Sequence, residues 1–437
     1  MASVEIKLQG RQIEDSRGKP TVQAVLTVDK VTGMGDVPAG ASKGEDEAQT
    51  VETSQAIDNI NKTLATMLKD AKLDLTKHED VRRFERMMAE AAGDNFKRLG
   101  ANAVVPVSRA LWQAAAALHK TELYDYIRTF EPGVAGKGRV GFFMNIYNGG
   151  LHALKKKDGE ILGKDRIDIQ EIMVVPVGAK TYQQAVEMGD KIDQTLKGLL
   201  EGKYGKAAVT RADEAGFSVK GLGDSSVAIG HVFEAIEKAG FAPGKDVKLA
   251  LDVAASSFLD KASGKYKFRG ELVDSGQMTA YYVELVDQYK GKILSIEDGL
   301  AENDWDGWTK QTKALGDRGV VTIGDDLFVT QMPRLRRGVQ AKSAHAILIK
   351  VNQNGSMLGT IEVMQFAKQN GMQCVVSHRS GETLDDSIAD LAYATGAMGL
   401  KTGDPQPTTD FPDKKTWVRR VKYLRMVAIE ARESGKR

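Results

Sequence analysis

The sequence has little cysteine and no long apolar run, and both absences narrow the class of protein. Its single cysteine, Cys374, excludes an internal disulfide framework. Because Cys374 lies within the apolar run QCVVSH, we interpret it as a small buried hydrophobe and not as a nucleophile. No apolar stretch approaches the ~18 residues of a membrane-spanning helix, so no membrane span is expected. No signal peptide is recognisable, and together these features predict a cytoplasmic protein.

Neither sign of charge dominates, and histidine is scarce. The chain has 61 Lys and Arg residues against 59 Asp and Glu residues, which gives a net charge of +2. This balance gives no sign of a nucleic-acid-binding or membrane-surface protein, so neither partner is expected. The six histidines and the lone cysteine never fall in zinc-ligand spacing, which disfavours a zinc site.

The length of 437 residues exceeds what one hydrophobic core usually supports, so two domains are expected. Residues 1–139 open with the alternating strands VEIKL and TVQAVLTV, which predicts an α+β domain with helices over residues 45–71, 79–92 and 107–121. A Pro/Gly-rich link, EPGVAGKGR, leads into a second domain over 140–437, where strands and helices alternate. Its helices are expected over residues 182–200, 225–239, 275–289, 306–314, 359–370 and 384–395.

Five short apolar runs in the second half of the chain each end on an ionisable residue. They are VKLALD, ILSIE, VVTIGD, AILIK and CVVSH, which end at Asp252, Glu297, Asp325, Lys350 and His378. Parallel strands buried on both faces read as continuous apolar runs, so charge at their ends predicts an α/β fold, a TIM-like (β/α) barrel with its chemistry on the C-terminal face. A single acid after a strand is usually a turn or helix-cap residue. Five in succession, spaced by 45, 28, 25 and 28 residues, favour one shared active-site rim.

Three of these residues predict a metal site and a fourth predicts a base. Asp252, Glu297 and Asp325 form an oxygen-only ligand set of the kind that suits Mg²⁺. Lys350 follows a buried strand, and both desolvation and a nearby metal ion would lower the pKa of a lysine toward the range useful for a general base. A lysine that only packs its stem against the strand is the alternative interpretation.

Further polar segments complete the expected site. The loop Ser377-His378-Arg379-Ser380-Gly381 combines a guanidinium, hydroxyls and an imidazole, which suits a phosphate or carboxylate group. Gln170-Glu171 follows the expected strand RIDI, and Asp213-Glu214 lies in a Gly/Ala-rich loop, so two acids are candidates for a proton-donating pair. Either acid alone would usually be a surface residue. The loop PAGASKG, over residues 38–44, is a candidate lid.

These segments, in this order, resemble the enolase family over most of the chain. Each piece is a weak signal by itself, whereas the ordered set is highly specific. The pieces are DSRGKPT (15–21), GAS (40–42), LGANA (99–103), NGGLHA (148–153), IQE (169–171), VPVGAKTY (175–182), DEAGF (213–217), SIED (295–298), GDDL (324–327), LIKVNQ (348–353), SHRSGET (377–383) and KTG (401–403).

The resemblance implies a (β/α)8 barrel with an N-terminal α+β capping domain, in which the first strands and helices depart from simple alternation. It also implies a homodimer and two Mg²⁺ ions per active site. Carried over position by position, the first Mg²⁺ would be held by Asp252, Glu297 and Asp325. The second would be held by Ser42 together with a phosphate of the substrate.

The resemblance also implies catalytic and substrate-binding roles. Lys350 would remove the proton from C2 of 2-phosphoglycerate, and Glu214, assisted by Glu171, would protonate the departing C3 hydroxyl. Lys401 would bind the substrate carboxylate. The other expected substrate contacts are His152, Arg379 and Ser380 at the phosphate, with His378 and Gln170 beside them in the sequence.

Several positions depart from the pattern of the family. The segment 154–166 is an insertion with three consecutive lysines, in a loop that normally closes over the substrate. Ala212 and Ala215 replace glycines around Glu214, and alanine restricts φ where glycine does not. KTG is followed by Asp404 in place of alanine. The stretch QPTTDF replaces an arginine-bearing segment near the expected dimer contact.

The favoured function is therefore an Mg²⁺-dependent hydro-lyase that interconverts 2-phosphoglycerate and phosphoenolpyruvate through an enolate, in glycolysis or gluconeogenesis. An enolase-like enzyme that runs the same chemistry on a different phosphorylated or phosphonylated acid stays open because of the insertion and of Ala212 and Ala215. A non-catalytic binding or structural protein on the same fold is the third hypothesis. The retention of residue type at every carried-over catalytic position argues against it.

Overall fold

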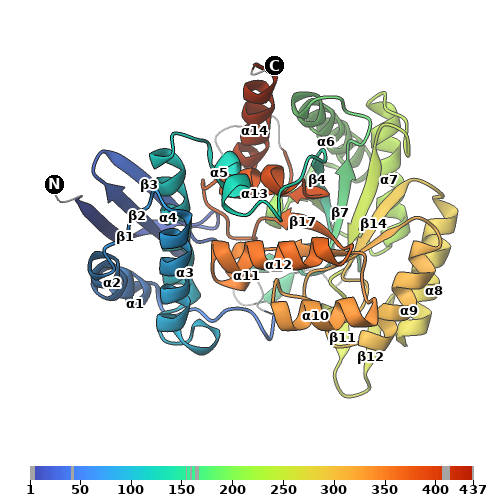
Figure 1. Cartoon of the computed structure of the whole chain (residues 1–437). Coiled ribbons are helices and arrows are strands. Elements are labelled where there is room, and N and C mark those ends of the chain that lie inside the picture. The colour runs from blue at the N-terminus through green and yellow to red at the C-terminus, as the bar shows by residue number, and fades with distance from the viewer. Residues whose placement is uncertain are drawn as a thin grey trace. The chain divides into compact units, whose positions relative to one another are not determined.

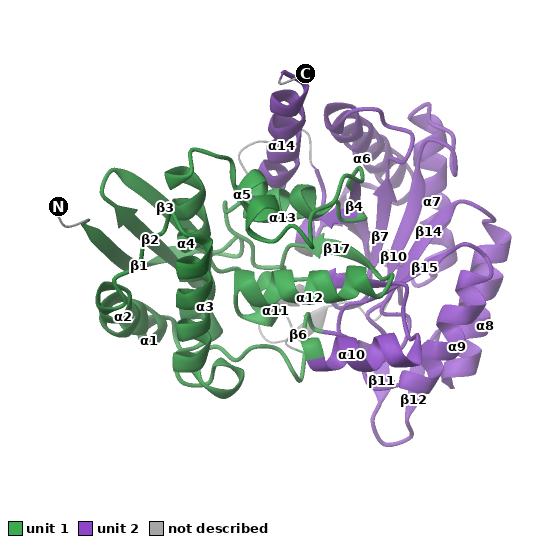
Figure 2. Cartoon of the chain, viewed as in Figure 1, with its two compact units in different colours: residues 1–140, 329–332, 349–398 green, residues 141–328, 333–348, 399–437 purple. Residues whose placement is uncertain are grey.

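The computed structural model describes residues 5–40, 44–153, 155–157, 160–162, 167–405 and 414–435 (Figure 1). Two compact units divide the chain (Figure 2). The first comprises residues 1–140, 329–332 and 349–398. The second comprises residues 141–328, 333–348 and 399–437. The chain therefore passes between the units several times.

A three-stranded antiparallel sheet opens the first unit. Its strands are β1 (Ile6–Glu14), β2 (Pro20–Val28) and β3 (Val31–Asp36), in that order across the sheet. The Asp15 side chain accepts hydrogen bonds from the N–H groups of Arg17 and Lys19 and so forms the turn between β1 and β2. On β3, a Cβ atom at Gly33 would lie 2.1 Å from the Ala110 carbonyl oxygen. Only glycine therefore allows helix α4 (Ala101–Leu118), which carries Ala110, to approach this strand.

Helices cover this sheet and extend the first unit. They are α1 (Thr53–Asp58), a π-helical turn (Asn59–Leu64), α2 (Ala65–Asp70), α3 (His78–Ala92), α4 (Ala101–Leu118), α5 (Leu123–Phe130), α11 (Val351–Asn354), α12 (Met357–Gln369) and α13 (Ser387–Thr395). The helix expected from residue 45 begins only at Thr53, and the one expected from 107 begins at Ala101. It passes through Pro106, because burial along nearly all of α4 outweighs the cost of an interior proline.

A closed barrel confirms the expected fold class. Its strands, from β18 through β4 in spatial order, are β18 (Gly399–Lys401), β17 (Gln373–Ser377), β16 (Ala346–Ile349), β15 (Val321–Gly324), β14 (Ile293–Glu297), β10 (Lys248–Asp252), β7 (Glu171–Val175) and β4 (Gly141–Asn148). β18 pairs back with β4 and so closes the barrel, and β9 (Phe217–Val219) and β8 (Val209–Arg211) extend the sheet from β4. All five predicted apolar runs are strands of this barrel.

The strand expected at RIDI is wrong. Glu171 does not follow a strand but begins one, β7, which runs antiparallel to both β4 and β10. Because β7 is reversed, its first residue lies at the same edge of the barrel as the last residue of β10. The register places Glu171 opposite Asp252.

Helices on the outside of these strands complete the second unit (Figure 1). They are α6 (Tyr182–Tyr204), α7 (Ser225–Lys238), α8 (Ser275–Gln288), α9 (Trp305–Gly316), α10 (Met332–Ala341) and α14 (Lys414–Gly435). Side-chain caps explain why four of them begin where they do, since each oxygen accepts a hydrogen bond from a first-turn N–H. The capping residues are Thr181, Asp224, Asp274 and Asp304.

Two small antiparallel sheets are separate from the barrel sheet. β11 (Leu259–Asp260), β12 (Lys265–Phe268) and β13 (Glu271–Val273) form an antiparallel sheet. Within the insertion after His152, β5 (Lys155–Lys157) pairs with β6 (Glu160–Leu162). Across the described parts of the chain, no helix has the length and apolar character needed to traverse a bilayer.

Candidate active site

Three acids lie side by side at one edge of the barrel. Asp252 is opposite Glu297 in the parallel ladder of β10 and β14 and opposite Glu171 in the antiparallel ladder of β10 and β7. Their relative exposures are 5% for Asp252 and 1% each for Glu297 and Glu171. Buried carboxylates at such spacing repel one another, so this edge requires positive charge.

Lys401, the last residue of β18, supplies part of that charge. Its Nζ lies 2.8 Å from Asp252 Oδ2, 2.8 Å from Glu297 Oε1 and 3.4 Å from Glu171 Oε2. Burial by itself would lower the pKa of Lys401, but the surrounding carboxylates, led by Asp252, raise that pKa well above its usual 10.5. Lys401 is therefore a fixed ammonium that is shared by three acids.

Asp325 is held through a residue that the sequence analysis did not single out. Asp298 accepts hydrogen bonds from the backbone N–H of Asp325 at 2.9 Å and of Asp326 at 2.8 Å. Carboxylate oxygens of these three residues lie within 4.8 Å of one another. Burial, and then the charges of Asp326 and Asp325, raise the pKa of Asp298 well above its usual value. Its adjacency to Glu297 in SIED was the signal that could have identified it.

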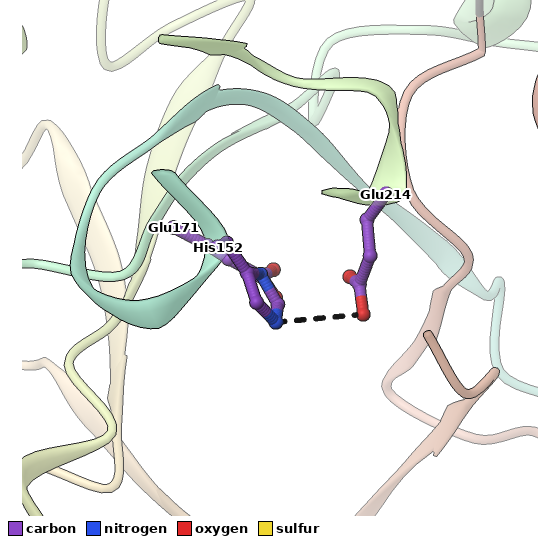
Figure 3. Close-up of side chains that lie close together, drawn as sticks. All are labelled: His152, Glu171 and Glu214. Carbon is purple, nitrogen blue, oxygen red and sulfur yellow. Dashed lines mark ion pairs between the residues drawn. The ribbon is translucent and has the colours of Figure 1, made fainter. Parts of the chain in front are cut away.

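His152, Glu171 and Glu214 form a second buried group (Figure 3). His152 lies in a short 3₁₀ turn, and its Nδ1 is 3.3 Å from Glu171 Oε1. Its Nε2 is 3.9 Å from Glu214 Oε1, and Figure 3 shows the two groups pointing toward each other. Burial, and then the charge of Glu214, raise the pKa of Glu171, while Lys401 and His152 oppose that rise. Such a pair of acids holds a proton more readily than either acid alone.

Gln170 positions this group through its backbone. Its carbonyl oxygen accepts a hydrogen bond of 2.9 Å from the Gly149 N–H, just before the turn that carries His152. On the other side, Asn145 donates to Asn148, and Asn148 donates to the carbonyl oxygen of Gly216. Buried amides on β4 therefore connect the turn of His152 to the loop of Glu214.

The predicted base, Lys350, and the predicted anion-binding loop over residues 377–381 belong to the first unit. Lys350 directly follows β16 and directly precedes α11, and its backbone N–H donates to Thr330 Oγ1 at 3.0 Å. β16 pairs in parallel with β15, so Lys350 and Asp325 both follow the carboxyl ends of neighbouring strands. The side chain of Lys350 is half-buried.

Arg379 forms a buried ion pair with an acid from the N-terminal part of the chain. Its Nη1 and Nη2 donate to the two carboxylate oxygens of Glu47, each at 3.1 Å, and Nη1 also donates to Asn352 Oδ1. His378 and Ser380, on either side of Arg379, are buried as well. Ser42, expected to bind a second metal ion, lies outside the described residues, as do seven positions of the insertion after His152.

Comparison with protein families decides what this arrangement belongs to. The model of the enolase C-terminal TIM barrel domain matches residues 140–425. The model of the enolase N-terminal domain matches residues 6–127. The chain belongs to the enolase family. It is therefore a lyase-type enzyme of a superfamily whose chemistry proceeds through an enolate. The enolase family acts on small phosphorylated acids.

The residues present fit the Mg²⁺ ions that enolases typically use. Asp252, Glu297 and Asp325 offer only oxygen donors, which a hard cation prefers. Glu297 is 1% exposed, and its Oε2 has no hydrogen-bond partner in the described part of the chain. A buried carboxylate oxygen without a donor is a natural metal ligand, because a cation would compensate its charge.

Proposed function

We propose that this enolase-family member catalyses the reversible, Mg²⁺-dependent dehydration of 2-phosphoglycerate to phosphoenolpyruvate. The observation that carries the proposal is Lys401, whose ammonium is shared by Asp252, Glu297 and Glu171 beside the buried acid Glu214. This arrangement places a fixed cation among buried carboxylates at one edge of the barrel, where the charge of Glu214 raises the pKa of Glu171.

The first step requires removal of a weakly acidic proton. A C–H bond beside a carboxylate resists deprotonation because the product carries additional negative charge on an anion. We assign the base role to Lys350 and binding of the substrate carboxylate to Lys401. Asp252, Glu297 and Asp325 would hold one Mg²⁺ ion and Ser42 would hold a second, and these ions would supply positive charge for the enolate.

The second step requires protonation of the C3 hydroxyl as it leaves. We assign this proton to Glu214, with Glu171 as its partner. The charge of Glu214 raises the pKa of Glu171, so the pair keeps a proton where a solvated glutamate would lose it. The phosphate and the remaining substrate oxygens are assigned to His152, Arg379, Ser380, His378 and Gln170.

An assay of ultraviolet absorbance with 2-phosphoglycerate and Mg²⁺ tests the proposal. We expect formation of phosphoenolpyruvate, abolished by EDTA and by Lys350→Ala. Lys310→Ala, at an exposed lysine of α9, is the matched control and should keep full activity. A folded wild-type protein that leaves 2-phosphoglycerate unchanged would refute the proposal.

A second candidate is the same chemistry on another phosphorylated or phosphonylated acid. The antiparallel pair of β5 and β6, in the insertion just after His152, favours it. Ala215 at φ +69° beside Glu214 favours it as well, because it distinguishes this loop from the glycine-bearing family pattern. This candidate predicts exchange of the C2 proton of an alternative acid in D₂O and slow turnover of 2-phosphoglycerate. Rapid turnover of 2-phosphoglycerate would argue against it.

We further infer that the protein is a cytoplasmic homodimer that acts in glycolysis or gluconeogenesis. The homodimer is carried over from the resemblance to the family, and the cytoplasmic location rests on the single buried Cys374. Light scattering coupled to size-exclusion chromatography tests the oligomer, and a mass near 47.5 kDa would contradict a dimer.

A further inference from the structure

Glu214 lies on a loop whose backbone is strained. The loop joins β8 to β9, which pair as an antiparallel hairpin with Arg211 opposite Phe217. Two consecutive non-glycine residues, Glu214 at φ +56° and Ala215 at φ +69°, occupy the left-handed region. L-amino acids avoid this region, so the surrounding structure must hold the loop in place.

Arg211 and Asp404 supply that restraint. Arg211 Nη1 donates to the carbonyl oxygen of Ala215 at 2.8 Å and to Asp404 Oδ2 at 2.6 Å. The backbone N–H of Asp404 donates to the carbonyl oxygen of Glu214 at 3.1 Å. The carbonyl group of Ala215 is therefore held by Arg211, and that of Glu214 is held by Asp404.

The surroundings of Arg211 fix its guanidinium. Nη2 donates to Asp193 Oδ2 of α6 at 2.6 Å, and the guanidinium carbon lies 4.2 Å from the centroid of the Phe217 ring. The side chains of Asp404 and Asp193 are 0% and 1% exposed. Planar, fork-shaped contacts of this kind hold an arginine in one orientation, which a lysine cannot reproduce.

Gly403 adds a steric restraint to the same loop. Its φ is +71°, and a Cβ atom at this position would lie 2.8 Å from the carbonyl oxygen of Glu214. The segment that carries Asp404 therefore packs directly against the loop. Asp404 stands where the family pattern has alanine, so the ion pair accompanies the alanines that replace the usual glycines of the loop.

We propose that Arg211 and Asp404 are positioning residues for Glu214, and that their ion pair replaces a glycine-rich loop as the means of aiming this acid. The inference rests on the proposed function, in which Glu214 protonates the departing hydroxyl. Neither residue is assigned a contact with substrate. Their effect is confined to the elimination step, because removal of the C2 proton is assigned to Lys350, on a different strand.

Asp404→Ala is the most direct test. It restores the alanine of the family pattern and leaves Arg211 neutralised by Asp193, so no buried charge loses its only partner. With Mg²⁺ and 2-phosphoglycerate in D₂O, we expect product formation to fall about tenfold or more, as displacement of a catalytic group does, and C2 exchange to stay within about twofold. Arg211→Lys should give the same separation of the two rates.

Asp190→Asn is the matched control. Asp190 lies one turn before Asp193 on α6 and forms an ion pair with Arg420 at 2.9 Å and 3.0 Å, and within the described residues its carboxylate has no hydrogen bond to residues 209–219. Asp190→Asn should not lower product formation more than it lowers C2 exchange. Equal loss of exchange and product formation in Asp404→Ala would show a general structural defect and overturn the inference, as would unchanged rates.

Hydrogen exchange of the backbone amides provides a readout that needs no substrate. We expect amides of residues 209–219 to exchange about tenfold faster in Asp404→Ala and Arg211→Lys than in wild type or Asp190→Asn, because the strained loop opens more often. Unchanged protection would overturn the inference. A wild-type protein that neither exchanges nor dehydrates 2-phosphoglycerate would instead refute the proposed function, while the amide data would still decide whether the ion pair holds the loop.

Discussion

Lys401 Nζ lies 2.8 Å from Asp252 Oδ2, although the two residues are separated by 149 positions in the sequence. The same ammonium also bonds Glu297, whose strand neighbours that of Asp252. One buried cation therefore compensates several acids that end neighbouring strands. Removal of the cation or of one acid should have opposite effects on stability.

Lys401→Met removes the ammonium and leaves three buried carboxylates without it. We expect the free energy of unfolding in EDTA to fall by about 3–5 kcal/mol, as for other broken buried pairs. The loss should be smaller at about pH 5 than at about pH 8, because protonation of the acids relieves their repulsion. Urea denaturation of the variant and of wild type at the two pH values measures this loss in the free energy of unfolding. Lys203→Met, at a partly exposed ion pair with Glu234, is the control, and an equal loss there would contradict the prediction.

Glu297→Gln should weaken the response to metal and not the fold itself. In EDTA the variant is expected to be at least as stable as wild type, since it removes one of the acids that compete for Lys401. Mg²⁺ at about 100 times its Kd should stabilise the wild type by about 2.7 kcal/mol, and the variant by much less. Thermal denaturation with and without Mg²⁺ measures the difference. Glu284→Gln, at an exposed glutamate of α8, should respond like wild type, and a full response of Glu297→Gln would exclude Glu297 as a ligand.

Glu85 predicts a pH dependence of stability in the first unit. This residue of α3 is buried, and its Oε1 accepts hydrogen bonds from Ser108 Oγ and from Trp112 Nε1. Its Oε2 has no hydrogen-bond partner within the described residues. Burial raises the pKa of Glu85 from 4.5 to about 7. The folded state therefore binds a proton between these pH values that the unfolded state has released.

Because of this difference in bound protons, the folded state loses stability as the pH rises. The stability due to protonated Glu85 is fully present below pH 4.5, falls as the pH rises and is lost above about pH 7. The loss amounts to about 3 kcal/mol. Glu85→Gln should remove this dependence and be the more stable protein at about pH 8. Urea denaturation across this range tests it, with exposed Glu90→Gln as control. A wild type whose stability stays constant from pH 4.5 to about 7 would contradict the prediction.

Glu47→Gln tests the ion pair with Arg379. The substitution keeps the size of the side chain but leaves the buried guanidinium without its bidentate carboxylate. We expect a loss of about 3 kcal/mol in the free energy of unfolding. Urea denaturation followed by circular dichroism measures the difference. Glu45→Gln, two positions away and exposed, should have no effect, and equal stability of the two variants would show that the ion pair contributes little.

The strands and acids of the barrel were predictable because their signal is local. A run of apolar residues reports burial on both faces, and the charge that ends it reports the strand end, so β10, β14, β15, β16 and β17 were found with their terminal residues. The direction of β7 was not predictable. Glu171 looks the same at either end of a short strand, and only pairing with β10 shows that the strand is reversed.

The helix boundaries were predicted less well for a related reason. Pro106 is a strong local signal against a helix interior, yet α4 passes through it because the packing of this buried helix stabilises it. Residues 45–52 are not helical, because tertiary contacts fix them in another conformation: Glu47 pairs with Arg379, and the Ala48 N–H donates to the carbonyl oxygen of Gln353. Local propensity is a weak term, and tertiary contacts override it.

The sequence by itself determined the barrel, the positions of Asp252, Glu297 and Asp325 at or directly after strand ends, and membership of the family, because these depend on residue order and short-range pattern. Only the tertiary structure decided which charged residues form ion pairs with one another. Lys401 joins Asp252 and Glu297, Glu47 joins Arg379, and Arg211 and Asp404 hold the loop of Glu214. Coulombic and hydrogen-bonding contacts act over a few ångströms of space and not along the chain, so no spacing in the sequence specifies them.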